Sequence, residues 1–237
     1  MLFNAPLSAD RADRLLDLLD LPDGASVMEV GCGRGELLLR LVSRWGCSAV
    51  GVDVDEAAIT AAQEAASKRA LSVDFRCGDA KLLALPQVDL AVCIGATQAY
   101  GLGAGAWHNT LRMFSRLVRP GGQMLIGEGF WARTPDPEYL AFLGDNPGIE
   151  KTHHENISSA EATGLIPLYA AESNRDEWDD FEWSHRLGIE RAAVAHPNDD
   201  AIQKRLIRSR AWREGYLKWG RTTMGFGFYL FGVPTSR

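Results

Sequence analysis

Val27-Met-Glu-Val-Gly31-Cys-Gly33-Arg-Gly35 is the stretch that decides the fold of this 237-residue chain. An apolar run passes into three glycines spaced G-x-G-x-G, and a helical pattern follows from Glu36. The pattern predicts a strand, a tight turn and a helix. A dinucleotide fingerprint would place its third glycine at position 36, where the Glu36 carboxylate would oppose a pyrophosphate on the helix N-terminus. The turn therefore favours a ligand without phosphate, with an ordinary tight turn as the alternative.

Outward from this turn, apolar runs alternate with helical patterns. The predicted strands are Ser26–Val30, Ser48–Asp53, Val73–Cys77, Val88–Ile94 and Gln123–Glu128. The predicted helices between them are Glu36–Trp45, Glu56–Arg69 and Ala106–Val118. Repeated strand-helix units predict a parallel sheet, and strands this apolar belong in a sheet that is covered on both faces.

The flanking segments add helices and two more strands. Ser8 is expected to cap a helix that runs to Asp20 and carries Leu15, Leu16, Leu18 and Leu19 on one stripe. After Glu128 we expect a loop at Thr134–Pro137, a helix opened by the capping box Thr152–Glu155, and a strand at Ile166–Ala171. Residues 174–221 are expected to form two helices broken at Pro197, followed by a last strand at Thr223–Val233.

Length and composition are consistent with one domain that buries a full core, since 46% of the residues are hydrophobic. The formal net charge of -6 argues against a nucleic-acid backbone as the main partner. The four cysteines lack zinc-ligand spacing, so no metal is expected and we predict that they are reduced and mostly buried. No long uncharged apolar run and no signal-peptide pattern occurs, which predicts a soluble, cytoplasmic protein without membrane contact.

Carboxylates follow two further strands at positions that suit a nucleoside. Asp53 lies eighteen residues past Gly35, where a carboxylate accepts both ribose hydroxyls. Asp79, in Cys77-Gly78-Asp79-Ala80, is placed to meet an adenine amino group, although a plain turn is an equal alternative. Glu29, just before the glycines, is placed to bind the amino-acid end of a ligand. All three fall at the carboxyl edge of the sheet and together favour S-adenosylmethionine as the ligand. Glycines have no side chain, so they let this ligand approach the backbone closely.

From about Ala25 to Phe130 the chain resembles the class I S-adenosylmethionine-dependent methyltransferases, and more narrowly the small bacterial ubiquinone-biosynthesis-like group. The resemblance rests on EVGCGRG, VGVDVD, the GDA turn and LVRPGGQMLIGEGFW in that order. It implies a Rossmann-like α/β fold: a mostly parallel seven-stranded sheet with an antiparallel last strand, helices on both faces and a helical lid. The expected parts are residues 1–23 (arm and helix), 24–130 (donor-binding core), 131–173 with 222–237 (rest of the sheet) and 174–221 (lid).

The resemblance implies S-adenosyl-L-methionine as donor and S-adenosyl-L-homocysteine as product. It implies donor contacts in the glycine turn and after the following strands, with the N-terminal arm, Phe3–Leu7, folded over the donor. The expected donor residues are Phe3, Asn4, Glu29, Gly31, Cys32, Gly33, Gly35, Asp53, Val54, Gly78, Asp79, Ala80, Ile94 and Gly95. Nucleic-acid amino-methyltransferases carry an Asn/Asp-Pro-Pro-Tyr/Phe motif where this chain has Cys93–Gln98, which disfavours base flipping.

Acceptor residues are expected in the loops above the sheet. Thr97, Gln98, Tyr100 and Trp131 are the candidates for the substrate pocket. Candidates for a general base are Glu128, His153 and His154, and adjacent histidines on a helix diverge so far that at most one faces a pocket. The alternatives are that both histidines are exposed and that Glu128 is a buried structural carboxylate.

The last part of the chain is rich in aromatic and charged residues. A subset of its aromatics is expected to enclose a small-molecule acceptor, while others are core: Trp131, Tyr139, Trp178, Phe181, Trp183, Trp212, Tyr216 and Trp219. The basic residues between Lys204 and Lys218 are expected to face the acidic residues between Glu172 and Glu182. The preferred hypothesis is a methyltransferase that acts on a small molecule. A homodimer is one oligomeric state considered for this protein. An RNA- or protein-directed enzyme and a non-catalytic donor-binding protein are the alternatives.

Overall fold

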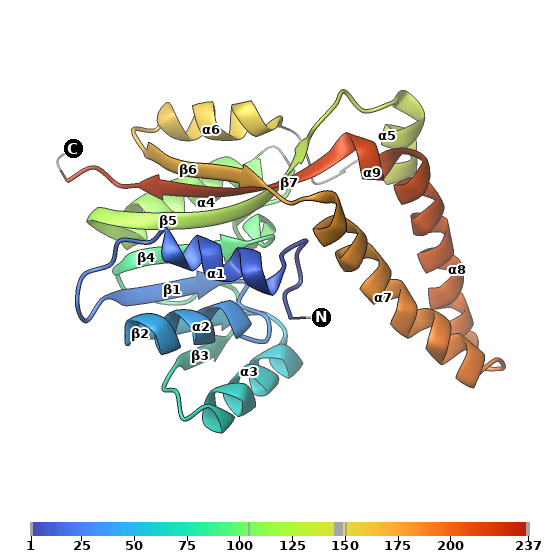
Figure 1. Cartoon of the computed structure of the whole chain (residues 1–237), viewed down its shortest axis with the longest axis horizontal. Coiled ribbons are helices and arrows are strands. Elements are labelled where there is room, and N and C mark those ends of the chain that lie inside the picture. Colours follow the sequence, from blue (N-terminus) through green and yellow to red (C-terminus); the bar gives the residue numbers. More distant parts are fainter. Residues whose placement is uncertain (1, 104, 145–148, 150, 236–237) are drawn as a thin grey trace.

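A seven-stranded sheet forms the centre of the computed structural model, which describes residues 2–103, 105–144, 149 and 151–235 (Figure 1). The strand order is β3-β2-β1-β4-β5-β7-β6. The strands are β1 Ser26–Val30, β2 Ser48–Asp53, β3 Asp74–Cys77, β4 Val88–Ile94, β5 Val118–Trp131, β6 Ile166–Glu172 and β7 Met224–Gly232. All pairs from β3 to β5 are parallel, and β7 runs antiparallel to both β5 and β6. The expected Rossmann-like sheet with its antiparallel last strand is confirmed.

Helices cover both faces of this sheet. Those packed on the sheet are α1 Ala9–Asp17, α2 Glu36–Trp45, α3 Glu56–Lys68, α4 Gly105–Leu117 and α6 His153–Glu161. The others are α5 Pro137–Leu143, α7 Arg175–Ala195, α8 Asp200–Gly215 and α9 Arg221–Thr223, of which α7 and α8 project away from the sheet (Figure 1). A 3-10 turn, η1 Thr97–Tyr100, follows β4, and a π-helical turn, η2 Tyr216–Gly220, follows α8. In the part of the chain that the structure describes, no helix is long and apolar enough to cross a membrane.

Alternation along each central strand builds two cores. On β5, Leu125 joins the core under α1, α2 and α3, whereas Met124 and Ile126 join the core under α4 and α6. Three of the four cysteines are buried, Cys77 is exposed, and all four are free. The strand order reverses between β1 and β4, so the carboxyl ends of these two strands open a crevice in which α/β folds bind ligands.

Several expected boundaries hold because the local signal is strong. Ser8 caps α1 and Asp55 caps α3 through side-chain oxygens, and Thr152 with Glu155 forms the predicted capping box. The break near Pro197 is also confirmed, since α7 ends at Ala195 and α8 begins at Asp200.

Two predicted elements had wrong boundaries, and one helix was missed. The first helix ends at Asp17 rather than Asp20, and Leu18 leaves the predicted apolar stripe to lie 42% exposed. Strand β5 begins at Val118 rather than Gln123, because the backbone of Gly121 and Gly122 pairs with Val233 beyond β7. It also ends at Trp131 rather than Glu128, because its last three residues pair with the beginning of β7. The expected loop at Thr134–Pro137 is present up to Asp136, but the helix α5 that follows it, which Asp136 caps and Pro137 starts, was missed.

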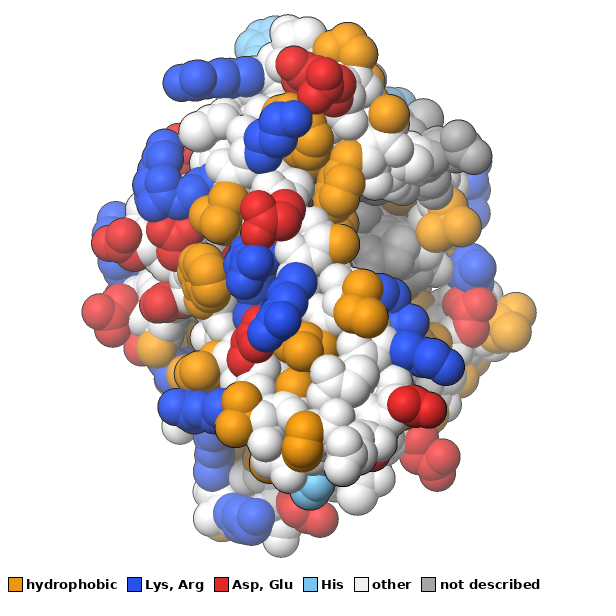
Figure 2. All heavy atoms as spheres, turned by 90° about the vertical axis from the view of Figure 1, so that its right-hand side faces the viewer, with side chains coloured by type: hydrophobic (Ala, Val, Ile, Leu, Met, Phe, Trp, Pro, Cys, Tyr) orange, Lys and Arg blue, Asp and Glu red, His pale blue; other side chains and the backbone are white. Residues whose placement is uncertain are grey.

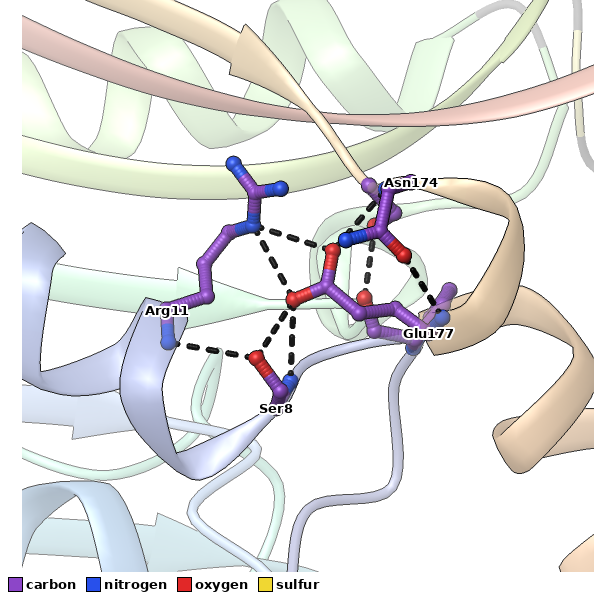
Figure 3. A network of polar contacts seen from close by, with 6 residues as sticks. Ser8, Arg11, Asn174 and Glu177 are labelled. Carbon is purple, nitrogen blue, oxygen red and sulfur yellow. Dashed lines mark hydrogen bonds and ion pairs between the residues drawn. The ribbon is translucent and has the colours of Figure 1, made fainter.

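The N-terminal arm is joined to the beginning of α7 by a buried carboxylate (Figure 3). Glu177, 6% exposed, accepts hydrogen bonds from Ser8 Oγ at 2.6 Å and from Arg11 Nε at 3.0 Å. It also closes the capping box of α7 with Asn174. These charged contacts hold the pKa of Glu177 below its usual value although burial opposes them. Segments far apart in sequence are thereby held together above the sheet.

We predict that Glu177→Gln lowers the free energy of unfolding by about 2 kcal/mol, because neutral Gln cannot replace a charge-assisted acceptor of two side chains. Urea denaturation monitored by circular dichroism measures this. Glu190→Gln on the same helix removes only a surface ion pair with Arg210 and should cost less than about 1 kcal/mol. Equal losses in the two variants would contradict a structural role for the Glu177 network.

Candidate functional site

Two adjoining cavities open at the carboxyl ends of β1, β2 and β4. Their volumes are about 470 Å³ and about 380 Å³. Asn4 of the arm, Gly31, Gly33, Asp53 and Ile94 line both of them. An elongated ligand can therefore lie across the glycine turn, with one end in each cavity. This is the crevice that the strand order creates.

Nearly all of the predicted donor residues line this pair of cavities. Those in the first cavity are Phe3, Asn4, Glu29, Gly31, Cys32, Gly33, Asp53 and Ile94. Those in the second are Asn4, Gly31, Gly33, Asp53, Val54, Gly78, Asp79, Ala80, Ile94 and Gly95. Gly35 lines neither, because it packs under the turn: a Cβ there would lie 2.6 Å from the Phe75 ring.

The glycine turn lies against the loop after β4. Gly31 has a φ of +75°, and a Cβ on it would lie 2.1 Å from the Cβ of Ala96. Its N–H donates to Val52 O at 2.8 Å, which fixes the turn to the end of β2. Only glycine both adopts this positive φ and leaves room for Ala96, so the backbone itself forms the wall of the cavities.

Asp53 shapes the turn as well as facing the cavities. Its Oδ2 accepts from the N–H of Gly33 at 2.8 Å, and its Oδ1 accepts from the N–H of Asp55 at 3.0 Å. Each carboxylate oxygen keeps a second lone pair for a ligand hydroxyl. The sequence position suggested only the ligand contact, because the bond to Gly33 depends on the folded turn.

Glu29 is the most unusual group in the first cavity. It is 4% exposed, and its Oε2 has no hydrogen-bond partner among the described residues. Burial raises the pKa of Glu29 to about 8. A buried acid with a free oxygen on a cavity wall is suited to a cationic or hydrogen-bond-donating ligand group.

The second cavity has a less polar floor. Asp79 accepts from the N–H of Lys81 at 2.9 Å, so the plain-turn alternative describes part of what this residue does. Its neighbour Gly78 has a φ of +155°, and Ala80 is buried. The turn nevertheless faces the cavity together with Val54 and Ala99. A flat, mostly apolar group with a polar edge fits these walls.

Three of the four expected acceptor residues lie in the turn η1, but only one of the four lines either cavity. Gln98 lines the second cavity. Thr97 is buried and donates a short hydrogen bond to Glu128, and Tyr100 is buried with its hydroxyl unpaired among the described residues. Trp131 instead makes an edge contact with Tyr139, with ring centroids 6.2 Å apart.

The three candidate bases differ in their surroundings, and none lines either cavity. Glu128 accepts from Thr97 Oγ1 and from the N–H of Gly129, and burial raises its pKa. His153 lies with Nδ1 3.0 Å from the hydroxyl of Tyr229, and burial lowers its pKa. His154 is exposed, so the two histidines diverge as expected.

Among the cavity residues that the sequence analysis missed, two carry nitrogen donors on the wall of the first cavity. Arg34, inside the glycine turn, and His185, in the middle of α7, both line the first cavity. His185 lies in a helix far from the motifs in sequence, so no local pattern marks it. The sequence signal available here was the capping box at Asn174. It fixes the residue at which α7 begins, and so which residues share one side of the helix.

The aromatic residues of the last part pack mainly on one another. Tyr139 of α5 stacks on Trp219 with ring centroids 5.6 Å apart, and Phe142 contacts Trp212 at 6.1 Å. Trp178 stacks on Tyr216 at 6.5 Å. None of these six aromatic residues lines either cavity, as far as the described residues show. They hold α5, α7 and α8 together.

Charged residues on the projecting helices are mixed in sign. Arg210 of α8 forms an ion pair with Glu190 of α7 at 2.7 Å, and Lys218 pairs with Glu138 at 3.0 Å. Figure 2 shows Lys and Arg side chains lying among acidic and hydrophobic ones at this end of the molecule. Both acids, Glu190 and Glu138, lie outside the segment Glu172–Glu182, so the basic residues do pair with acids but the expected partners were wrong.

Comparisons with known proteins agree with this geometry. A family model described as "Methyltransferase domain" matches residues 27–122. The chain is 25% identical to the uncharacterized protein YjhP of Escherichia coli (strain K12), over 94% of this chain and 91% of that protein. It is 26% identical to 27-O-demethylrifamycin SV methyltransferase of Amycolatopsis mediterranei (strain S699), over 85% of this chain and 77% of that protein.

A solved structure shares the fold closely. The S-adenosylmethionine-dependent methyltransferase of Geobacter sulfurreducens, solved with S-adenosyl-L-homocysteine, superposes with a TM-score of 0.85. The two sequences are 24% identical, and the match covers 97% of this chain and 92% of that one.

We predict that ligand-free protein loses stability as the pH rises, because Glu29 must ionise in a buried site. A carboxyl group with a raised pKa stabilises the fold fully below its unfolded-state pKa, and that contribution is lost as the pH rises through about 8. From about pH 5 to about pH 8, wild type should lose roughly 3 kcal/mol more than Glu29→Gln. Denaturant titrations at several pH values measure this, with exposed Glu64→Gln as the control. Parallel curves for wild type and Glu29→Gln would show that Glu29 is not desolvated.

Proposed function

Because this chain is a class I S-adenosylmethionine-dependent methyltransferase, we propose that it methylates a small molecule held between the glycine turn and the lid, residues 174–221. The name of the Amycolatopsis relative states an O-demethylated compound as its substrate, which supports a small acceptor here. The mixed charge of α7 and α8 supports the same choice, because a nucleic-acid partner favours a continuous basic face. The net charge of -6 points in the same direction.

The residues of the two cavities fit the donor. Its amino-acid end carries a cationic amino group, which suits the unpaired Oε2 of Glu29 in the first cavity. Its ribose hydroxyls suit the free lone pairs of Asp53, which lines both cavities. Its adenine suits the turn at Asp79 and Ala80 in the second cavity. The unpaired buried carboxylate of Glu29 is the observation that carries this assignment.

The bound donor supplies an activated methyl group, so the chain has to align the acceptor and exclude water. Of the three candidate bases, we retain Glu128. Its partner Thr97 lies between Ala96 and Gln98, which both line the second cavity. His153 is instead engaged with Tyr229, and His154 is exposed. The raised pKa of Glu128 brings it nearer to neutrality, where a carboxylate is a more effective base.

We predict that binding of S-adenosylhomocysteine at pH 7 releases close to one proton. Glu29 is mostly protonated in the free protein, because its pKa is about 8, and a ligand ammonium favours its ionised form. Calorimetry in two buffers of different ionisation enthalpy measures the release. Glu29→Gln should abolish the release and weaken binding about tenfold, while Glu64→Gln should change neither. Proton uptake, or no exchange in wild type, would contradict the place given to the amino group.

We predict that a methyl-labelled donor, incubated with enzyme and clarified cell extract, transfers its label to the small-molecule fraction. Label in RNA or protein fractions would contradict a small acceptor. Donor binding without label in any fraction would favour a non-catalytic protein. With an acceptor in hand, Glu128→Gln should lower kcat about a hundredfold, whereas exposed Glu161→Gln should not. Wild-type activity should rise with pH through the raised pKa of Glu128, because only the ionised carboxylate accepts a proton.

A further inference from the structure

The first cavity has both acidic and basic groups on its walls. Glu29 lies at its buried end, on β1. Arg34, an exposed residue of the glycine turn, lines the same cavity and forms no ion pair with any residue that the structure describes. Glu36 also faces this cavity, but both of its oxygens are bound by Arg40 and Arg69. Besides Asp53 and Asp55 at the turn, the cavity therefore offers the unpaired buried acid Glu29 and the unpaired base Arg34 to a ligand.

His185 brings a second nitrogen donor to this cavity from the lid. Glu177, Phe181 and His185 are spaced four residues apart, which places them along one side of α7. Glu177 binds Ser8 and Arg11 at the start of α1, directly after the arm, and the ring of His185 makes an edge contact with Phe181 at 5.3 Å. This side of α7 thus faces the N-terminal arm. His185 reaches the cavity beside Leu2 and Phe3.

We propose that Arg34 and His185 bind the carboxylate of the donor's amino-acid end, so that the lid senses the donor directly. The proposal rests on the donor placement given above. An amino acid bears its ammonium and carboxylate on one carbon, and the cavity that holds Glu29 for the ammonium also holds Arg34 and His185. A guanidinium and an imidazole N–H are both strong donors to a carboxylate.

A role for His185 as the acceptor's base is the competing assignment. His185 does not line the second cavity, which is lined by Gly95 and Gln98 of the loop after β4. It shares the first cavity with Glu29, Arg34 and the arm. The shared cavity favours contact with the amino-acid end of the donor over contact with the acceptor.

The assignment has a consequence for the lid. His185 belongs to α7, and α7 is joined to the arm through Glu177. A carboxylate bound by His185 would hold helix, arm and glycine turn around the donor before any acceptor arrives. The lid would therefore close on the donor itself and not on the acceptor.

Calorimetry with two ligands tests the proposal. S-adenosylmethionine has the carboxylate, and decarboxylated S-adenosylmethionine lacks it. Wild type should prefer the first, and Arg34→Gln and His185→Phe should each weaken that ligand alone about tenfold. His185→Phe keeps a ring against Phe181 but has no N–H, and His185→Gln should restore part of the affinity. Exposed His154→Gln and Arg205→Gln serve as controls.

A second readout follows the lid itself. S-adenosylmethionine should protect α7 from limited proteolysis in wild type and in His185→Gln, but not in His185→Phe. The decarboxylated ligand should not protect it in any of them.

Three results would overturn the proposal: equal losses for both ligands, unchanged binding in His185→Phe, or a fall in kcat with the donor Kd unchanged. The last would assign His185 to the acceptor. Failure of wild type to bind S-adenosylmethionine at all would instead overturn the donor placement, which the Glu29→Gln variant tests separately.

Discussion

The close approach of two loops at the carboxyl edge of the sheet is the constraint on which the rest of this structure depends. Gly31 lies so near Ala96 that no side chain fits between them. The backbone after β1 can therefore cross in front of the loop after β4 and leave room on both sides. Asp53 holds the turn in this position through Gly33. Both cavities share this turn as a wall, and every donor contact proposed here depends on its shape.

Much of the central fold could be predicted because its signals are local. The strands from Ser26–Val30 to Val88–Ile94 are short apolar runs bounded by turns, and their boundaries were correct to within a residue. The extension of β5 could not be predicted, since Gly121 and Gly122 pair with the far end of the chain. Helix α5 was missed for a related reason: Asp136 and Pro137 mark a helix start as readily as a turn.

The residues of the candidate site likewise divide into those that local sequence signals predict and those whose positions depend on packing. Residues such as Asp53 and Asp79 could be found because parallel strands bring their carboxyl ends to one edge. Their place on the cavity walls is visible in the structure, while their contacts with a donor remain proposals. Arg34 was missed because it lies within the glycine motif, and the motif was interpreted from its glycines. His185 could not be found, because its position depends on how α7 packs against the arm. The expected aromatic enclosure likewise depended on packing, and Tyr139 and Trp219 turn out to face each other.

The place of β7 has a consequence for how this chain is made. β7 is the last strand in sequence, yet it lies between β5 and β6. On a ribosome, β6 emerges more than fifty residues before its only neighbour in the described sheet. Until then the edge of β5 and the whole of β6 have unsatisfied backbone groups, which is the condition in which strands join the wrong partners. Completion of the sheet must wait for Met224–Gly232, so translation that stops short of it leaves a nascent chain with two open edges.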